Sequence, residues 1–425
     1  MISSTRVWRS AALVALAGMA LAACGGSSGG DTGTGDGGAK TLTISSDLPL
    51  QGSSKDAAAA MNNAIKLYLD QVDNKAGNFT IKFKEYDDST AAKGAWDDAT
   101  CAKNAQDHVA NASEVAVMGT YNSGCAKIIV PVLNQDPDGP MLMVSHANTN
   151  PGLTKTWDPG EPDKFYPTGT RNYARVVTTD DFQGAADSTY IAQDLKKKRC
   201  YVLNDNQTYG QGVAQAFVDN AKKVGLTILG NDPWDAKQPN YTALFQKIKA
   251  KNPDCIFLAG IYDNNGGQLV KDKVKVLGDN TKVIMMGPDG FSGYTDLQKQ
   301  KEGEGMYLSF AGLDTESLRK NGGGAAKFLD AYKAKYGADP STSYALYAVA
   351  AVQVILKAIE GSDGSRKSIT DQVFGGAGIT IPADVSVIGK EIIIDPKTGD
   401  TNNKDISILQ LTSGVEKFVK AQPVE

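Results

Sequence analysis

Only two of the 425 residues are histidines, His108 and His146, and this shortage limits the chemistry open to the chain. Zinc sites and Ser-His-Asp relays draw on imidazole side chains, and the cysteines form no metal-binding cluster. We therefore expect no catalytic residue, no metal and no cofactor. We interpret His108 as a helix-surface residue and His146 as a structural residue of a loop.

Four small polar loops carry the side chains that could contact a ligand, and each follows a short apolar run. They are GTYNSG (119–124), SHANTNPG (145–152), IYDNNGG (261–267) and GPDG (287–290). None of them pairs a nucleophile with a base. The glycine spacing of GTYNSG lacks the Lys-Ser/Thr that follows it in a phosphate-binding loop. The loops therefore indicate binding without catalysis.

Strand-like runs alternate with helical patterns, which is typical of a parallel α/β architecture. Thr41–Leu48 and Phe79–Tyr86 alternate with period two. Compact apolar runs predict buried strands at 115–118, 141–144, 200–203, 226–229, 255–260 and 282–287. Ligands of open parallel sheets bind beyond the carboxyl ends of the strands, so the four loops stand where a ligand should bind.

Two segments predict long helices. Apolar residues recur at helical spacing over Asp56–Lys75, after the possible N-caps Ser53 and Ser54. Ser341–Glu360 is apolar nearly all round, although Gln353 and Lys357 interrupt it. We interpret this second segment as a helix buried in a domain core, not as a membrane span.

The first residues of the chain predict export and lipid anchoring. Met1–Ala23 has two arginines, a short apolar stretch and the sequence Leu-Ala-Ala-Cys, so that Cys24 would become the lipidated first residue. The alternative is a plain secretory signal in which Cys24 is incidental. Gly25–Ala39 has no large apolar residue and predicts a flexible linker. Loss of the signal would change the net charge from −4 to −6, which does not favour a nucleic-acid partner.

The other four cysteines of an exported chain can pair in three ways. Cys101 and Cys125 lie on either side of one predicted helix and strand. Cys200 and Cys255 each open a strand-like run, and their starts would lie side by side if the strands are parallel neighbours. We predict the disulfides Cys101–Cys125 and Cys200–Cys255. The alternative for all four is a set of buried free thiols.

From Thr41 onward the chain resembles the type I periplasmic solute-binding proteins, and in particular the leucine/isoleucine/valine-binding proteins of branched-chain amino-acid ABC importers. The most specific stretches are SHANTNPGLT (145–154), NDNQTYGQGVAQAF (204–217), AGIYDNNGGQLVK (259–271) and MMGPDGF (285–291). The resemblance implies an α/β fold of two doubly wound parallel-sheet lobes, joined by three crossovers that act as a hinge. Lobe one would comprise 41–173 plus 311–382, and lobe two 174–310 plus 383–425.

The same resemblance implies a set of ligand-binding residues. Ser123 would hold the carboxylate of an amino acid at a helix start, Ala147 would offer a carbonyl and Thr149 a hydroxyl. Tyr209 and Tyr262 would reach in from the second lobe, and Asp289 would pair with the ammonium group. Elementary chemistry agrees, because a helix N-terminus binds a carboxylate without an arginine. One facing carboxylate then complements the ammonium.

Structural alternatives exist for these residues. Ser123 could be a helix N-cap, Thr149 a turn former, Tyr209 a packing residue and Asp289 part of a Gly-Pro-Asp-Gly turn.

The chain also departs from the family pattern. Aspartate replaces the usual glutamate at position 289, the loop at 48–60 lacks an aromatic residue, and the cysteine of GTYNSGC is shifted. Tyr121, Asn122 and Asn264 suggest a pocket more polar than one for leucine.

The resemblance implies a monomeric receptor, anchored outside the cytoplasm, that captures an amino acid or a related small zwitterion for an importer permease and its ATPase. A second hypothesis is a sensory domain of the same fold with a signalling partner, and another is a receptor for an amide, a polyamine or a small aromatic acid. A hydrolase that uses Ser123 or Asp289 is a third class, for which the chain offers little histidine to act as the base.

Overall fold

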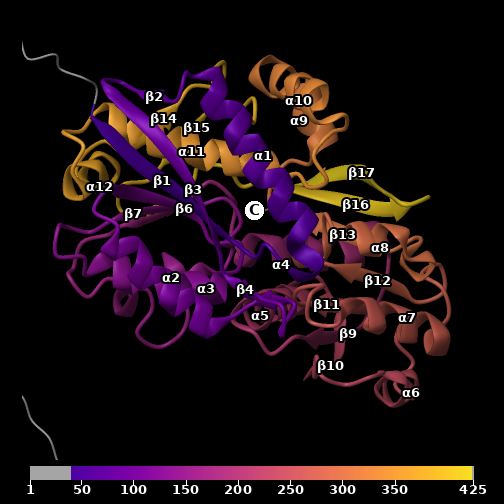
Figure 1. Ribbon diagram of the computed structural model, residues 1–425. Coiled ribbons are helices and arrows are strands. Elements are labelled where there is room, and N and C mark those ends of the chain that lie inside the picture. The colour runs from indigo at the N-terminus through magenta and orange to yellow at the C-terminus, as the bar shows by residue number, and fades with distance from the viewer. Residues whose placement is uncertain (1–39, 424–425) are drawn as a thin grey trace, which may run out of the picture. The chain divides into compact units, whose positions relative to one another are not determined.

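Two β-sheets organise residues 40–423, which are the residues that the computed structural model describes (Figure 1). The first sheet has the strand order β2-β3-β1-β6-β7-β8 and is parallel except for the β2–β3 pair. Its strands are β1 (Thr41–Leu48), β2 (Lys75–Ala76), β3 (Phe79–Asp87), β6 (Glu114–Gly119), β7 (Leu142–Ser145) and β8 (Tyr173–Arg175). The predicted strands at 41–48, 79–86, 115–118 and 141–144 all lie in this sheet.

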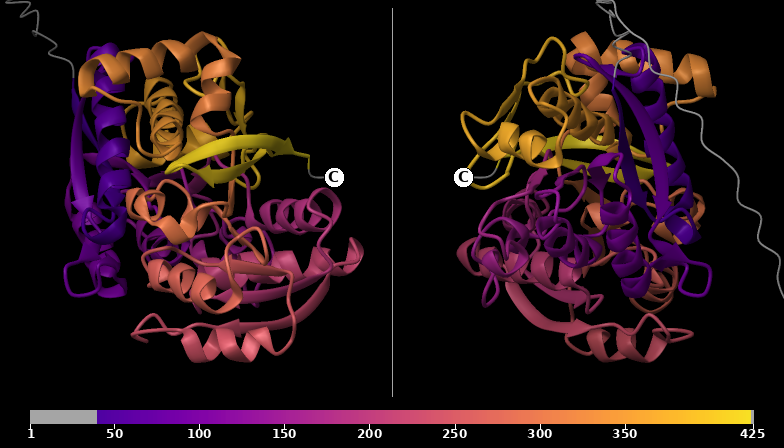
Figure 2. Two further views of the ribbon diagram at one scale, coloured as in Figure 1. Left: turned by 90° about the vertical axis from the view of Figure 1, so that its right-hand side faces the viewer. Right: turned by 60° about the vertical axis from the view of Figure 1, so that its left-hand side comes forward.

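The second sheet has seven strands in the order β10-β9-β11-β12-β13-β16-β17. These are β9 (Arg199–Asn204), β10 (Thr227–Pro233), β11 (Cys255–Ala259), β12 (Ile284–Gly287), β13 (Tyr307–Phe310), β16 (Ile406–Thr412) and β17 (Val415–Gln422). The first five are parallel, whereas β16 and β17 join as an antiparallel hairpin. The turn of that hairpin uses positive φ angles at Ser413 and Gly414. Both views of Figure 2 show these C-terminal strands in yellow.

Helices and short elements complete the described chain. The α-helices are α1 (Lys55–Gln71), α2 (Asp98–Ala110), α3 (Ser123–Asn134), α4 (Asp180–Thr189), α5 (Thr208–Lys223), α6 (Thr242–Lys249), α7 (Gly266–Leu277), α8 (Thr295–Lys299), α9 (Thr315–Asn321), α10 (Gly323–Tyr336), α11 (Tyr344–Glu360) and α12 (Arg366–Phe374). Two small hairpins pair β4 (Ser89–Thr90) with β5 (Ala95–Trp96), and β14 (Ile379–Ile381) with β15 (Ile392–Ile394). Single helical turns are η1 (Gly52–Ser54), η2 (Pro151–Leu153), η3 (Asp163–Phe165), η4 (Tyr190–Asp194), η5 (Asp289–Phe291) and η6 (Lys301–Gly303).

Both faces of the central strands are buried in each sheet, which confirms the predicted α/β class with doubly wound parallel sheets. Along β6, Ala116 and Met118 belong to one hydrophobic cluster, whereas Val117 between them belongs to another. The same alternation holds along β11, where Phe257 lies in one cluster and Leu258 in the other. Successive side chains of a strand point to opposite faces, so continuous apolar runs are what such strands require.

Helix α11 confirms the prediction of a core helix at 341–360. Fifteen of its 17 residues are buried, and it packs against α1, β6 and β7. Gln353, which interrupts the apolar pattern, donates a hydrogen bond to the carbonyl of Val385 and so compensates its own burial. Among the helices of the described residues, none is both long enough and apolar enough to span a membrane.

Helix α1 differs from its prediction at both ends. It stops at Gln71, four residues before the expected end, because Asp73 and Asn74 adopt positive φ angles of 55° and 52°. Ser54 occupies the N-cap position, but its side chain makes no capping bond. Its hydroxyl instead donates to Asp263, in the loop after β11, at 2.7 Å.

Both predicted disulfides are present. Cys101 in α2 is bonded to Cys125 in α3, with the Cα atoms 5.6 Å apart. Cys200 and Cys255 are direct partners in the register of β9 and β11, and they form the second disulfide. The predicted signal peptide, Cys24 and the linker up to Ala39 lie outside the described residues.

The prediction that His108 lies on a helix surface is wrong. Its ring is fully buried between two acids, with Nδ1 2.5 Å from Glu114 Oε1 and Nε2 3.1 Å from Asp47 Oδ2. Burial alone would lower the pKa of His108, but the hydrogen bonds and charges of Asp47 and Glu114 raise it to about 9. Burial alone would raise the pKa of Glu114. The hydrogen bond and the charge of His108 outweigh burial, so the pKa of Glu114 lies below its ordinary value. The imidazolium therefore joins α2 to β1 and β6.

This buried ion pair predicts a pH-dependent stability. Because the pKa of His108 is higher in the folded state than in the unfolded chain, its contribution is complete below about pH 6.5 and is lost as the pH rises through about 9. His108→Gln should therefore lower the free energy of unfolding by about 3 kcal/mol more at pH 6 than at pH 9.5. Urea unfolding of both proteins across this range measures the difference, and a pH-independent difference would contradict the ion pair.

Candidate functional site

Loops from both sheets enclose a small pocket, whose cavity has a volume of only about 20 Å³ because side chains fill most of the space. Most of its walls follow the carboxyl ends of β6, β7, β9, β11 and β12, where an open parallel sheet binds its ligand. Helix α11 and the segment before α8 supply the rest. The lining residues are Tyr121, Asn122, Ser123, Ala147, Tyr209, Ile261, Asp289, Gly290, Tyr294 and Tyr344.

Four of the six predicted site residues line this pocket, namely Ser123, Ala147, Tyr209 and Asp289. Thr149 is fully buried in the same loop as Ala147, and its hydroxyl has no hydrogen-bond partner among the described residues. Tyr262 is not part of the pocket lining. It lines a neighbouring outer groove instead, and its ring packs 5.0 Å from the ring of Tyr294.

The start of α3 forms one end of the pocket. Asn122 is the N-cap residue and makes no side-chain capping bond, so the first backbone N–H groups of α3 receive no cap from it. The N-cap alternative for Ser123 is therefore wrong, because Ser123 is the first residue of the helix. Its hydroxyl accepts a hydrogen bond of 3.3 Å from the backbone N–H of Asn150. The remaining amides suit an anionic group.

Asp289 in η5 supplies a carboxylate to the pocket, and it is only 5% exposed. The hydroxyl of Tyr209 donates to Oδ1 at 2.6 Å, and that of Tyr344 donates to Oδ2 at 2.5 Å. Burial raises the pKa of Asp289, and these two hydrogen bonds act against the rise. A carboxylate has about four lone-pair sites, so acceptor capacity remains for a cationic group. Asp289 therefore bonds residues of α5 and α11 and is more than part of a Gly-Pro-Asp-Gly turn.

His146 lies behind the pocket wall as a structural residue. Its ring stacks on that of Tyr121 at 5.9 Å and meets the edge of Tyr344 at the same distance. Burial lowers the pKa of His146 to about 3, which keeps the imidazole neutral. It therefore packs against the tyrosines and brings no charge to the pocket.

Sequence reasoning missed Tyr294 and Tyr344 as pocket residues, and it misplaced Asn264. Tyr344 begins the core helix α11, more than 50 residues after Asp289, and no local motif marks it. Asn264 faces the outer groove, where its amide donates to Asp205 at 2.9 Å. The aromatic side chains absent from the 48–60 loop are thus supplied by other parts of the chain.

A second buried carboxylate separates the pocket from the outer groove. Asp263 accepts hydrogen bonds from the backbone N–H of Ser54 at 3.0 Å and from its hydroxyl at 2.7 Å. The hydroxyl of Tyr294 donates to the same carboxylate at 2.6 Å. Burial raises the pKa of Asp263, and these partners oppose the rise. The contact joins the segment after β1 of the first sheet to the loop after β11 of the second.

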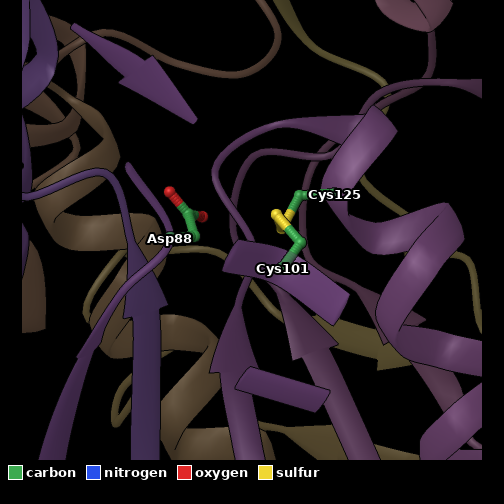
Figure 3. A group of neighbouring side chains, drawn as sticks. All are labelled: Asp88, Cys101 and Cys125. Carbon is green, nitrogen blue, oxygen red and sulfur yellow. A yellow bond between two sulfur atoms is a disulfide. The ribbon is translucent and has the colours of Figure 1, made fainter. Parts of the chain in front are cut away.

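One group of side chains has the composition of a metal site but cannot act as one. Asp88, Cys101 and Cys125 bring potential ligand atoms within 4.8 Å of one another (Figure 3). Both sulfur atoms belong to the disulfide, so neither is a thiolate while that bond is intact. A lone carboxylate does not make a transition-metal site.

Comparisons with known proteins identify the family of the chain. A family model described as "Periplasmic binding protein" matches residues 41–414. The Leu/Ile/Val-binding protein BraC3 of Rhizobium johnstonii is 27% identical over 308 residues, which cover 72% of this chain and 75% of that protein. The leucine-specific-binding protein of Salmonella typhimurium is 27% identical over 293 residues, which cover 67% and 70%.

Solved structures share the fold. The leucine-binding protein LivK of Thermotoga maritima superposes with a TM-score of 0.72 at 20% identity, covering 90% of this chain and 98% of that one. A solute-binding protein of an ABC transporter from Rhodopseudomonas palustris, solved with 3,4-dihydroxybenzoic acid, has a TM-score of 0.71 at 17% identity, with 91% and 98% covered.

The close packing of Gly290 predicts a sensitive position. An added Cβ would lie 2.3 Å from the carbonyl oxygen of Gly260 and 2.8 Å from the ring of Tyr209. Gly290→Ala should therefore lower the free energy of unfolding by about 1–3 kcal/mol. Gly376→Ala is the matched control, because nothing lies within 4 Å of its Cβ position. If urea unfolding gives the two variants equal free energies of unfolding, the pocket wall accommodates the added methyl group and the prediction is wrong.

Proposed function

The chain belongs to the periplasmic binding protein family, and from this we propose that it captures an amino acid or a related small zwitterion and delivers it to an ABC importer permease. It is a substrate-binding protein of the Leu/Ile/Val-binding type, and its homologues are binding proteins, not enzymes. The relatives named for leucine, isoleucine and valine support an amino-acid ligand.

The observation that carries the proposal is the pairing, in one pocket, of an uncapped helix start with a buried carboxylate. The backbone amides of α3, with the hydroxyls of Ser123 and Thr149, would hold the ligand carboxylate. Asp289 and the carbonyl of Ala147 would hold the ammonium group. Tyr209 would support Asp289, as its hydrogen bond to that carboxylate indicates. Tyr262, which lines the outer groove, would contact a ligand that enters from that side.

Ligand entry would require the two sides of the pocket to separate. We propose two lobes that follow the two sheets and close on the ligand about the crossovers. Because β8 pairs within the first sheet up to Arg175 and β15 pairs with β14, residues 174–175 and 383–394 belong with lobe one and not with lobe two as predicted. The bonds from Ser54 to Asp263 and from Tyr344 to Asp289 would break on opening and form again on closure. The closed form is the one that we expect a permease to recognise.

An aromatic acid is the second candidate ligand, because structures of the same fold hold hydroxybenzoates and four tyrosines line the pocket. Such an anion would leave Asp289 without a cationic partner. Removing one member of a buried charge pair is costly, so the zwitterion fits the pocket better.

A thermal-shift panel tests the proposed ligand class. Leucine, valine, threonine, asparagine, putrescine, acetamide and 4-hydroxybenzoate are offered singly to the purified protein. A bound ligand raises the melting temperature by mass action, and we expect amino acids to do so. A shift with 4-hydroxybenzoate alone would favour the second candidate, and a panel without any shift would remove the amino-acid proposal.

Asp289 should be essential for affinity. Asp289→Ala leaves the ligand ammonium buried without its partner, so binding of the best amino acid should weaken by about 2–5 kcal/mol. Asp384→Ala, at an exposed aspartate outside the pocket, is the control. Isothermal titration calorimetry measures both variants. A change in Kd of less than tenfold for Asp289→Ala would exclude this residue from the site.

Cys24 should decide whether the protein stays on the membrane. We propose that the signal Met1–Ala23 is removed and that lipidated Cys24 anchors the mature chain outside the cytoplasm through the linker to Ala39. Cys24→Ser should move the protein from the membrane fraction to the soluble extracytoplasmic fraction, as seen by immunoblotting. Retention of the variant on the membrane would contradict the lipid anchor.

A further inference from the structure

We infer that the pocket selects an amino acid whose side chain carries a hydrogen-bond donor, and that it discriminates against the branched aliphatic isostere. This inference rests on the proposed amino-acid function and adds the chemical class of the ligand side chain. It rests on the polar groups of the pocket wall that would remain after others have bound the amino and carboxyl groups of the ligand.

Four of the ten residues that line the pocket are tyrosines. Tyr121, Tyr209, Tyr294 and Tyr344 are all buried, with exposures of 8%, 7%, 1% and 1%. Ile261 is the one branched aliphatic residue among the lining side chains described. A buried tyrosine hydroxyl needs a hydrogen-bond partner, so the direction of each hydroxyl decides what the wall offers to a ligand.

Three of these hydroxyl protons are already used. Tyr209 and Tyr344 donate to Asp289, and Tyr294 donates to Asp263. A hydroxyl that has given its proton can only accept a further hydrogen bond. Tyr209 also accepts from the backbone N–H of Gly290 at 3.1 Å, so the lone pairs that remain for a ligand donor are mainly those of Tyr294 and Tyr344.

Tyr121 and Tyr294 are the two tyrosines of the wall that do not donate to Asp289. The hydroxyl of Tyr294 faces that of Tyr121, and the hydrogen bonds of the described residues give Tyr121 no carboxylate or backbone partner. Burial raises the pKa of Tyr121, and the negative charges of Asp263 and Asp289 raise it further. The pocket lining contains no lysine or arginine to offset them. This end of the pocket is negative and rich in acceptors.

An aliphatic side chain placed here would remove water from the Tyr121 and Tyr294 hydroxyls without replacing its hydrogen bonds. A site built for a polar group rejects the analogue that lacks it strongly, whereas an apolar pocket discriminates weakly against an added hydroxyl. A hydroxyl, amide or ammonium group on the ligand would satisfy the same oxygens. We therefore expect at least about a tenfold preference for the polar member of an isosteric pair.

Two isosteric pairs test this preference by isothermal titration calorimetry on the intact mature chain. Threonine and valine differ by one hydroxyl for one methyl group, and asparagine and leucine differ by an amide for two methyl groups. We expect threonine to bind at least about tenfold more tightly than valine, and asparagine more tightly than leucine. If valine and leucine bind as tightly as their partners or more tightly, the inference is overturned while the amino-acid proposal stands. If none of the four binds, both are overturned.

Removal of single hydroxyls locates the preference. Tyr121→Phe keeps the ring and should lower the threonine-to-valine affinity ratio by about tenfold, mainly by weakening threonine. Tyr294→Phe should act in the same direction. Tyr336→Phe, whose hydroxyl donates to the Asn63 carbonyl outside the pocket, is the matched control and should leave the ratio unchanged. Melting temperatures show whether the Tyr121→Phe and Tyr294→Phe variants are folded. If folded variants keep the threonine-to-valine affinity ratio unchanged, the assignment to these hydroxyls is overturned.

Discussion

A carboxylate taken out of water must be compensated, and the pocket is built around that requirement at Asp289. Burial pushes its pKa up, and hydroxyl donors from Tyr209 and Tyr344 support the charged form. Tyr209 belongs to α5, which packs on β9 of the second sheet, whereas Tyr344 belongs to α11, which packs on β6 and β7 of the first. Compensating one charge therefore ties elements of both sheets to the same point.

Asp263 repeats this arrangement at the border with the outer groove. Its partners are Ser54, next to the start of α1, and Tyr294. Hydrogen bonds between polar groups exchange with water at a small net free energy, which suits contacts that open and close around a ligand. The apolar clusters beneath the sheets do not have this property, because exposing them costs free energy in proportion to their area.

The scaffold beneath the loops is stiffened away from the pocket. A disulfide joins α2 to α3, another joins β9 to β11, and His108 connects α2 with β1 and β6 through two buried acids. These links fix elements within one sheet layer, whereas the bonds of Asp263 and Asp289 run between segments of different sheets. Stiff layers and exchangeable contacts between them are what a closing binding site requires.

The sequence by itself predicted eight strands, the core helix and the loops at strand ends, because these depend on local periodicity and on turn residues. It did not predict β8, β13 or the C-terminal hairpin of β16 and β17. It also indicated Ser123, Ala147, Tyr209 and Asp289, which the structure brings to one pocket. Only the tertiary structure decided the rest. Tyr344 and Tyr294 reach the pocket through long-range packing, and Ser54 exchanges a capping role for a bond to Asp263 more than 200 residues away. His108 is buried because Asp47 and Glu114 compensate the cost of burying its charge. The periodicity of one helix cannot indicate such partners from other elements.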